Sequence, residues 1–331
     1  MSWLGKGLAI AVFFGLIGLA ILAWPGVISK KEKREFGVTF SQSHATGIGL
    51  DWREVYQAIL YDLGVKKLRL SAYWDQVEPE PGRFNFADLD YQLDAAEEAG
   101  AGVVLGVGRK LPRWPECHTP GWARGLSEAE QQAQVLELIK VVVERYRDHA
   151  AVLAWQVENE PLFDFGICPP ADREFLAREV ELVRRLSPGR KIIVTDSGEL
   201  SLWLEAAQFG DELGTTMYRT VFSEKRGGYF SYDYIFPAWL YRVKARVIGL
   251  VYGKPVRIVE LQGEPWGTKS FTELSREERD KSFSLERFDD LKDFSERTGL
   301  GGAYWWGVEY WYWVKTVEGD PAFWEKARGM F

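Results

Sequence analysis

From Phe36 onward, short apolar segments alternate with longer segments in which apolar residues recur every three or four positions. The short segments are apolar on both faces, as expected of strands buried in a parallel sheet, and the longer ones fit amphipathic helices. The predicted strands are Phe36–Ser41, Val65–Ser71, Gly102–Gly108, Val152–Val157, Lys191–Asp196, Glu212–Tyr218, Val256–Glu260 and Gly302–Trp306. The predicted helices include Trp52–Leu63, Leu89–Ala99, Ser127–Arg147, Arg173–Leu186, Leu200–Phe209, Pro237–Val251 and Arg276–Thr298.

Residues at the ends of several helices support these boundaries. Asp51 can cap the first helix, Gly100 can close the second, and Ser127 with Glu130 forms the Ser-x-x-Glu pattern of a capping box. Eight strands that alternate with helices predict an α/β fold of the (β/α)8 TIM-barrel type. A doubly wound open sheet is the alternative fold, and it is disfavoured because no Gly-x-Gly-x-x-Gly turn follows any predicted strand.

The amino-terminal segment has a different pattern. No charged residue occurs from Gly7 to Ile28, and an apolar stretch of roughly 20 residues is long enough to cross a bilayer as a helix. A cleaved signal peptide is the alternative, but its apolar region would be shorter and a small-x-small cleavage site would follow. We therefore expect a membrane anchor and basic linker at residues 1–35, followed by the barrel domain at residues 36–331.

Charges around this segment leave its orientation open. Lys6 precedes it, whereas a basic cluster at residues 30–34 follows it, and the positive-inside rule would keep the barrel in the cytoplasm. Cys117 and Cys168 follow the third and fourth predicted strands. They could pair as a disulfide, which would favour an oxidising compartment, or stay as two free thiols. We expect a single-pass membrane protein with its barrel outside the cytoplasm.

Composition narrows the classes of partner. The formal net charge is −7, so there is no basic field for nucleic acid, and nucleic-acid binding is not expected. The chain contains 15 Trp, 14 Tyr and 19 Phe, and those in predicted loops could stack on sugars or simply fill the core. His44, His118 and His149 share no metal-ligand spacing. We expect neither a metal nor another cofactor.

Two predicted strands lead directly into glutamates. Glu160 follows the fourth strand, within Trp155-Gln156-Val157-Glu158-Asn159-Glu160-Pro161, and Glu260 ends the seventh strand. Unpaired carboxylates are costly to bury, so two of them at the same rim of a barrel indicate chemistry that needs a pair. The carboxyl ends of barrel strands carry the active site, and glycoside hydrolysis uses two such carboxyl groups.

These residues resemble the clan A glycoside hydrolases. Asn159-Glu160-Pro161 after strand four and a lone Glu260 ending strand seven resemble the clan pattern, and residues 155–160 are similar to the strand-four signature of its β-galactosidase families. Trp306-Gly307-Val308-Glu309 is similar to a xylanase-type stretch. The resemblance implies a retaining enzyme in which Glu160 is the acid/base and Glu260 is the nucleophile.

The resemblance also implies roles for neighbouring residues. Arg69 would lie near the nucleophile, Tyr218 would hydrogen-bond it, and Asn159 would bind the sugar 2-hydroxyl. The aromatic residues expected to border or floor the substrate groove are Trp74 and Trp306. Glu158 and Glu264 are additional acids for which we expect structural roles, and the loop at residues 108–118 matches no particular family.

The sequence therefore predicts a retaining glycoside hydrolase that cleaves β-linked oligosaccharides or polysaccharides through a covalent glycosyl-enzyme intermediate. A transglycosylase would use the same residues, and a sugar-binding barrel that has lost catalysis is a third possibility. The expected partners are a β-linked glycan and, through the amino-terminal helix, a membrane. Glucan, galactan, xylan and mannan differ by single hydroxyl or hydroxymethyl groups, so the pattern does not select the sugar, and it indicates no oligomeric state.

Overall fold

The computed structural model describes residue 15, residues 17–18 and residues 35–331. Within these residues, eight parallel strands close into a barrel in the order β1-β10-β9-β6-β5-β4-β3-β2. The strands are β1 (Phe36–Thr39), β2 (Lys67–Ser71), β3 (Gly102–Val107), β4 (Val152–Val157), β5 (Lys191–Asp196), β6 (Glu212–Met217), β9 (Val256–Gln262) and β10 (Gly301–Trp306). The predicted (β/α)8 fold is confirmed.

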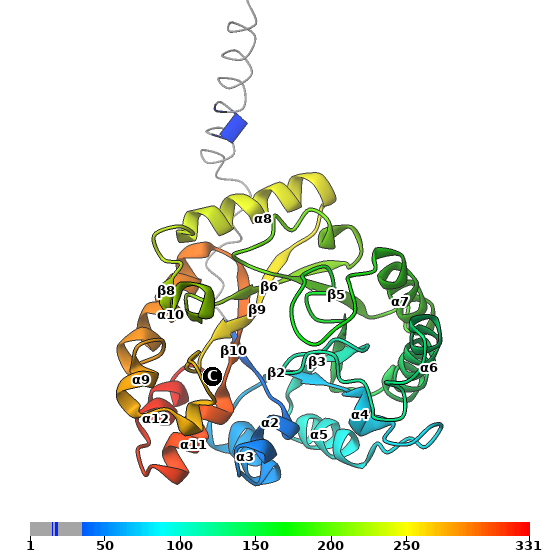
Figure 1. Cartoon of the computed structure of the whole chain (residues 1–331), viewed down its shortest axis with the longest axis horizontal. Helices are drawn as coiled ribbons and strands as arrows, with labels where there is room; N and C mark the ends of the chain where they lie inside the picture. The colour runs from blue at the N-terminus through cyan, green and yellow to red at the C-terminus, as the bar shows by residue number, and fades with distance from the viewer. Residues whose placement is uncertain (1–14, 16, 19–34) are drawn as a thin grey trace, which may run out of the picture.

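Helices surround the strands, as Figure 1 shows. The longer ones are α5 (Ala87–Glu98), α6 (Glu128–Tyr146), α7 (Arg173–Leu186), α8 (Ala238–Tyr252), α10 (Leu285–Thr298), α11 (Val308–Val317) and α12 (Ala322–Arg328). Shorter helices are α2 (Gln42–Gly47), α3 (Trp52–Gln57), α4 (Trp74–Val77) and α9 (Arg276–Asp280). Helix α6 packs beside α7, and α8 packs beside α10. This arrangement leaves the loops that follow the strands gathered at one rim.

The core has two parts, as the alternation of side chains along barrel strands requires. Side chains that point into the barrel form a small central cluster composed of Val104, Ala154, Ile193, Val259 and Tyr304. Side chains that point outward pack against the helices in a much larger cluster, which includes the fully buried Trp155 and Trp305. The strands are therefore buried on both faces, which explains their continuous apolar pattern.

The predicted helix ends are largely correct. Asp51 caps α3 by accepting hydrogen bonds from the backbone N–H groups of Arg53 and Glu54. Ser127 and Glu130 form the expected capping box at the start of α6. Gly100, which follows α5, has a φ angle of 65°, a left-handed conformation that glycine adopts readily.

Two predicted helices are wrong in extent. Residues 200–209 form only one 3-10 turn, Ala206–Gln208. Trp203, which is fully buried, has a φ angle of 69°, and a right-handed helix cannot pass through that conformation. The predicted helix at residues 276–298 is divided into α9 and α10, because Ser284 caps a new helix with its side chain.

The segment between β6 and α8 forms a hairpin of β7 (Thr220–Ser223) and β8 (Gly228–Ser231). Arg219 anchors its base, because the buried guanidinium contacts Glu199 and Asp233. The segment is thus a hairpin held at the rim of the barrel.

The predicted membrane helix from Gly7 to Ile28 lies outside the described residues except for residues 15, 17 and 18. Across the part of the chain that the structure describes, no helix has both the length and the apolar character that a bilayer crossing demands. The membrane anchor therefore stays a prediction.

Candidate active site

Glu260 lies near the end of β9 and is buried, with both carboxylate oxygens hydrogen-bonded. Arg69 on β2 donates from Nη1 to Oε1 at 2.8 Å, and Tyr218, directly after β6, donates from its hydroxyl to Oε2 at 2.7 Å. The guanidinium is itself only 1% exposed. The two donors, one of them a cation, orient both oxygens of Glu260, an arrangement that suits a nucleophile.

Arg69 connects Glu260 to the strand-four motif. Its Nε donates to Gln156 Oε1 at 2.7 Å, and its Nη2 donates to Asn159 Oδ1 at 2.8 Å. One guanidinium therefore contacts groups from β4, from the loop after β4 and from β9. Because the fork of an arginine is rigid and planar, these contacts fix the relative positions of Asn159 and Glu260.

Glu160 lies opposite, in the loop after β4, with a φ angle of 44°. Its backbone N–H donates to Thr195 Oγ1 at 2.7 Å, and its Oε1 accepts a hydrogen bond of 2.9 Å from Thr216 Oγ1. Thr216 on β6 is the ladder partner of Glu260 on β9. The two glutamates therefore converge on the same place in the rim.

The electrostatic surroundings of the two glutamates differ. Burial is the largest cause that raises the pKa of Glu160 well above its usual range, and the negative charges of Glu260 and Glu116 add to it. Glu160 contacts the uncharged Thr216, whereas Glu260 contacts Arg69. The surroundings thus favour the protonated form of Glu160, while Glu260 has a cation beside it, and acid-assisted nucleophilic substitution needs such an asymmetry.

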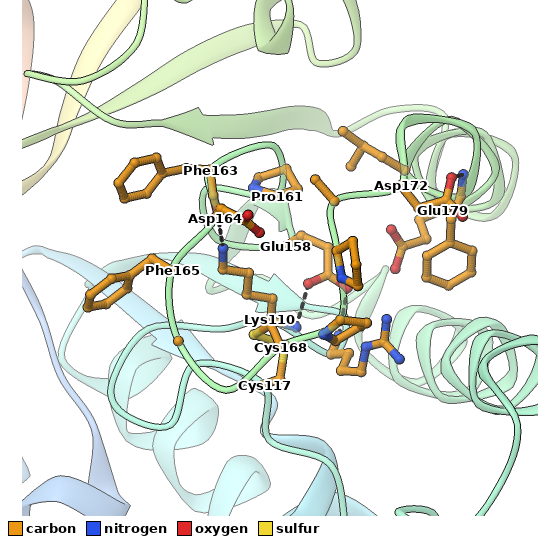
Figure 2. A pocket seen from close by; sticks show the side chains of 17 residues that line it. Lys110, Cys117, Glu158, Pro161, Phe163, Asp164, Phe165, Cys168, Asp172 and Glu179 are labelled. Carbon is orange, nitrogen blue, oxygen red and sulfur yellow. Dashed lines mark hydrogen bonds between the residues drawn. A yellow bond between two sulfur atoms is a disulfide. The ribbon is translucent and has the colours of Figure 1, made fainter.

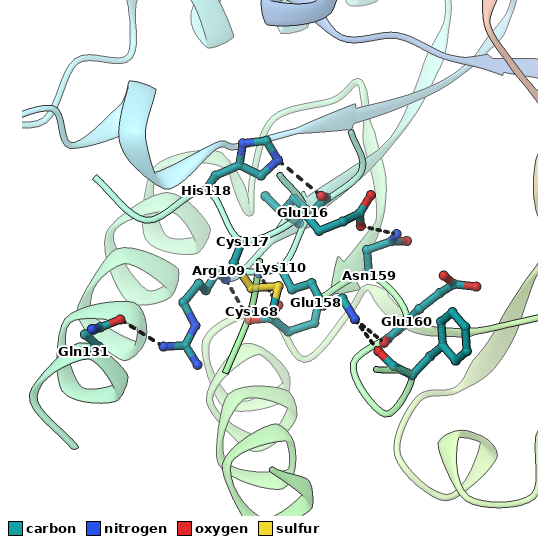
Figure 3. Close-up of a disulfide and its surroundings, with 12 residues drawn as sticks. Arg109, Lys110, Glu116, Cys117, His118, Gln131, Glu158, Asn159, Glu160 and Cys168 are labelled. Atoms are coloured by element: carbon teal, nitrogen blue, oxygen red, sulfur yellow. Dashed lines mark hydrogen bonds between the residues drawn. A yellow bond between two sulfur atoms is a disulfide. The ribbon is translucent and has the colours of Figure 1, made fainter. Parts of the chain in front are cut away.

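Glu116 is a third carboxyl group in the site, and the sequence analysis missed it. It is 7% exposed, and its Oε2 accepts a hydrogen bond of 3.3 Å from Asn159 Nδ2. Burial, followed by the negative charge of Glu260, raises the pKa of Glu116 to about 8. Figure 3 shows its side chain directed toward Asn159, on the side where Glu160 lies. The only feature of the sequence that could have drawn attention to Glu116 is the adjacent Cys117.

A disulfide holds the loop that carries Glu116. Cys117, after β3, is bonded to Cys168, after β4, and Figure 3 shows this bond joining the two loops. The structure thus pairs the two cysteines.

His118 belongs to the same loop, where its Nε2 lies 3.1 Å from Arg113 O and its ring lies 4.2 Å from that of Tyr73. His118 therefore packs inside the loop and helps to hold its conformation.

Lys110 holds the loop after β4 through two of its backbone carbonyl groups. Its Nζ donates to the carbonyl oxygen of Glu160 at 3.0 Å and to that of Phe163 at 2.5 Å. Burial lowers the pKa of this lysine. Because both acceptors are backbone carbonyls of the loop that carries Glu160, Lys110 sets the position of the Glu160 backbone.

Glu264 contacts Trp306 and Arg113 at the rim of the barrel. It accepts a hydrogen bond of 2.8 Å from Trp306 Nε1 and a second one from Arg113, whose guanidinium lies 4.1 Å from the centre of the Trp306 ring. Arg113 also donates to Glu309 at 2.8 Å. Glu264 therefore holds the indole of Trp306 in place, which agrees with the structural role expected for this extra acid.

Trp74 does not lie where the sequence analysis expected it. Its side chain is fully buried, its Nε1 donates to Glu78 Oε2 at 2.9 Å, and its ring packs edge-on against Trp122. Trp74 has no exposed surface on which a sugar could stack, so we correct this prediction: Trp74 packs against Trp122 and Glu78.

A cavity of about 310 Å³ lies behind the loop after β4, and Figure 2 shows Glu158 and Glu179 facing it. Neither Glu160 nor Glu260 lines it. Glu158 accepts hydrogen bonds from the backbone N–H groups of Arg109, at 2.7 Å, and Lys110. It thereby joins the loops after β3 and β4, which is the structural role expected for it.

Comparisons with known proteins agree with this geometry. The glycoside hydrolase 42 family model, described as "Beta-galactosidase", matches residues 51–225. "Endo-1,4-beta-xylanase 3" of Hypocrea jecorina is 27% identical over 200 residues, which are 58% of this chain and 52% of the xylanase. "Beta-galactosidase Pbg" of Clostridium perfringens is 27% identical over 130 residues, or 33% of this chain and 18% of that protein. The chain spans about half the length of the first of these relatives and less of the second.

Solved structures show the same fold at low identity. Xylanase 10B from Thermotoga maritima aligns with a TM-score of 0.59 and 17% identity over 89% of this chain and 95% of its own. A β-galactosidase from Rahnella sp. R3 aligns with a TM-score of 0.58 and 14% identity over 84% of this chain and 51% of its own. These alignments support the barrel.

Proposed function

The chain belongs to the glycoside hydrolase 42 family, and on that premise we propose that it is a retaining glycoside hydrolase that cleaves β-linked oligosaccharides or polysaccharides. The observation that carries the proposal is the asymmetric pair of glutamates. Arg69 and Tyr218 bind both oxygens of Glu260, while burial and neighbouring negative charge raise the pKa of Glu160. A retaining mechanism requires one ionised and one protonated carboxyl group.

The first half of the reaction uses both groups. An oxygen of Glu260 attacks the anomeric carbon, the bond to the leaving oxygen breaks, and Glu160 gives its proton to that oxygen. The products are an ester between the sugar and Glu260 and a free alcohol. In the second half, ionised Glu160 removes a proton from water, the water oxygen attacks the anomeric carbon, and Glu260 leaves as a carboxylate.

Asn159 is the residue we propose for the sugar 2-hydroxyl. Its Oδ1 accepts from Arg69, and one of its Nδ2 hydrogens points to Glu116. The second Nδ2 hydrogen remains for substrate. Trp306, held by Glu264 and covered on one face by Arg113, is the proposed floor beneath the sugar at the point of cleavage.

We further propose that the enzyme is anchored in a membrane and that its barrel faces an oxidising compartment. An uncharged stretch from Gly7 to Ile28 supports the anchor. The disulfide between Cys117 and Cys168 supports the compartment, because disulfides are rare in reducing cytosol.

The deciding experiment measures the stereochemistry of the first product. Aryl β-glycosides of galactose, xylose, mannose and glucose are offered to the enzyme, and the hydrolysed sugar is followed by proton NMR. We expect the β-anomer to appear first and the α-anomer to grow later by mutarotation. An initial α-anomer would contradict the retaining mechanism, and formation of new glycosides in place of free sugar would identify a transglycosylase.

A further inference from the structure

A row of aromatic rings leads from the nucleophile to the surface. The ring of Tyr218, whose hydroxyl binds Glu260, lies 5.1 Å from that of Trp266 between ring centres. Trp266 lies 6.3 Å from Phe165, which lies 6.3 Å from both Trp114 and Phe163. We name Trp114, Phe163, Phe165 and Trp266 the aromatic ridge.

The outer part of the aromatic ridge faces solvent. Trp114 is 66% exposed and Phe165 is 36% exposed. Figure 2 shows the rings of Phe163 and Phe165 on the same side of the loop after β4, at the left of the view. Contiguous exposed apolar surface is a mark of interaction and ligand-binding sites, and here it continues from the candidate active site.

The chain holds the aromatic ridge in a defined position. Trp114 and Phe165 belong to different loops, which the Cys117–Cys168 disulfide joins close to both residues. The backbone N–H of Ile167 also donates to Pro115 O at 3.0 Å. At Gly166 the two loops approach so closely that an added Cβ would lie 2.6 Å from Glu116 Cβ. Rings fixed in this way lose little conformational freedom when a ligand binds.

The chemistry of the aromatic ridge selects its ligand. Flat apolar rings stack on a flat partner that also has an apolar face, and the pyranose units of a β-linked chain present C–H groups on their faces. The ridge begins at Trp266, beside Tyr218, whose hydroxyl binds Glu260, so a bound chain would extend from the point of cleavage across Trp266 and Phe165 to Trp114. The rings are tilted against one another by 45° and 72° at the last two steps, which suits a twisted chain better than a flat crystal surface.

We propose that the aromatic ridge binds sugar units of a β-linked glycan beyond the unit at Glu260, so that the enzyme acts on chains of several units. This inference rests on the proposed hydrolase function, but binding tests it separately from turnover.

The first experiment uses Glu260→Gln, which removes the nucleophile and allows substrate to bind without being cleaved. Binding of gluco-, xylo-, manno- and galacto-oligosaccharides of two to six units is measured by calorimetry. For the chain type that binds, we expect the Kd of the tetrasaccharide to be at least about tenfold below that of the disaccharide, equivalent to about 1.4 kcal/mol. If no oligosaccharide binds, or if affinity does not rise with length, the proposal is wrong.

The second experiment compares Trp114→Ala with Trp239→Ala, a control on α8 whose ring is 53% exposed and lies outside the aromatic ridge. Relative to wild type, Trp114→Ala should lower kcat/KM on the long chain about tenfold more than on an aryl glycoside. Trp239→Ala should change the two values equally. Phe165→Ala provides a second variant if Trp114→Ala folds poorly by circular dichroism.

The outcomes separate the two proposals. If the wild type cleaves no glycoside but Glu260→Gln binds longer chains more tightly, the proposed hydrolase function is wrong and the proposed glycan binding by the aromatic ridge is supported. If aryl glycosides are cleaved but Trp114→Ala and Phe165→Ala affect long and short substrates equally, the ridge proposal fails and the hydrolase stands. If Trp114→Ala instead converts a dimer to a monomer in sedimentation and leaves glycan binding intact, the ridge is a self-association surface and the proposal is overturned.

Discussion

Glu260 is the residue whose contacts assign its role most directly, since a cation and a hydroxyl hold its two oxygens. Replacing it with Gln keeps the shape of the side chain and removes the nucleophile. We expect Glu260→Gln to lower kcat roughly 10⁴-fold or more while substrate still binds. A fluorinated mechanism-based glycoside should label Glu260 in the wild type, as peptide mapping will show. Labelling of Glu264, which holds Trp306, would contradict the assignment.

If Glu160 is the general acid, the effect of removing it should depend on the leaving group of the substrate. General acid assistance contributes typically 10²–10⁴-fold when the departing oxygen is basic, and much less when it is already a good leaving group. We therefore expect Glu160→Ala to lose roughly 10³-fold on an alkyl glycoside or oligosaccharide and far less on a dinitrophenyl glycoside. Plotting log kcat/KM against leaving-group pKa gives the measurement. Parallel lines for wild type and variant would argue against Glu160 as the acid.

Glu116 should set the alkaline limit of activity. Its pKa is raised to about 8, so it gains negative charge near that pH, and this charge opposes ionisation of Glu160. Since activity requires protonated Glu160, the charge on Glu116 extends activity to higher pH. We expect Glu116→Gln to move the alkaline limb of the kcat profile to lower pH and leave the acidic limb in place. Because the carboxyl groups titrate together, the limbs describe the group as a whole. An unchanged profile would limit Glu116 to packing.

The positions of the two glutamates proposed as catalytic could be predicted from the sequence, because strand ends are local and their place in a barrel is fixed by topology. Glu116 was not, because its place depends on left-handed conformations at Arg113 and Glu116 and on a disulfide to a different loop. The prediction that Trp74 borders the substrate groove was wrong for a different reason. A tryptophan is a suitable residue type for such a groove, but tertiary packing decides whether its ring faces solvent or the core, and here it is fully buried.

At the scale of elements, the apolar strands predicted the barrel because burial on both faces leaves an uninterrupted pattern. Residues 200–209 do not form the predicted helix: Leu200 and Leu204, four positions apart, would share one helix face, yet both are exposed. The buried residue is Trp203, whose Nε1 donates to Ser197 O at 2.9 Å. One side-chain hydrogen bond and a left-handed residue thus override a helical pattern over ten positions.

The contact between the loops after β3 and β4 gives a prediction at this scale. Gly166 has a φ angle of 89°, and an added Cβ would lie 2.6 Å from Glu116 Cβ. Gly166→Ala should cost about 1–3 kcal/mol of stability through strain and should lower kcat/KM by displacing Glu116. Gly125→Ala is the matched control, because its Cβ would meet nothing within 4 Å. Equal melting temperatures and activities for both variants would show that the loops adapt freely.

At the scale of the whole molecule, two observations disagree about the side of the membrane on which the barrel lies. The basic cluster at residues 30–34 favours a barrel in the cytoplasm by the positive-inside rule. The disulfide between Cys117 and Cys168 favours an oxidising compartment. The proposed glycan substrates, which are usually extracellular polymers, agree with the disulfide. The charge rule is a bias counted over short flanks, whereas a disulfide needs an oxidant to form, so we give the disulfide more weight.

Two measurements on whole cells test this weighting. If the barrel is outside, Cys117 and Cys168 should resist alkylation until a reductant is added, because both sulfurs are bonded. Protease applied to intact cells should then release an active fragment that begins after Arg34, since the folded barrel starts with β1 at Phe36. A cytoplasmic enzyme carrying the same tag serves as the control for cell integrity. If both thiols alkylate freely and the barrel is cleaved only after lysis, the basic cluster determines the orientation, and the substrate must be sought among cytoplasmic or membrane-linked glycans.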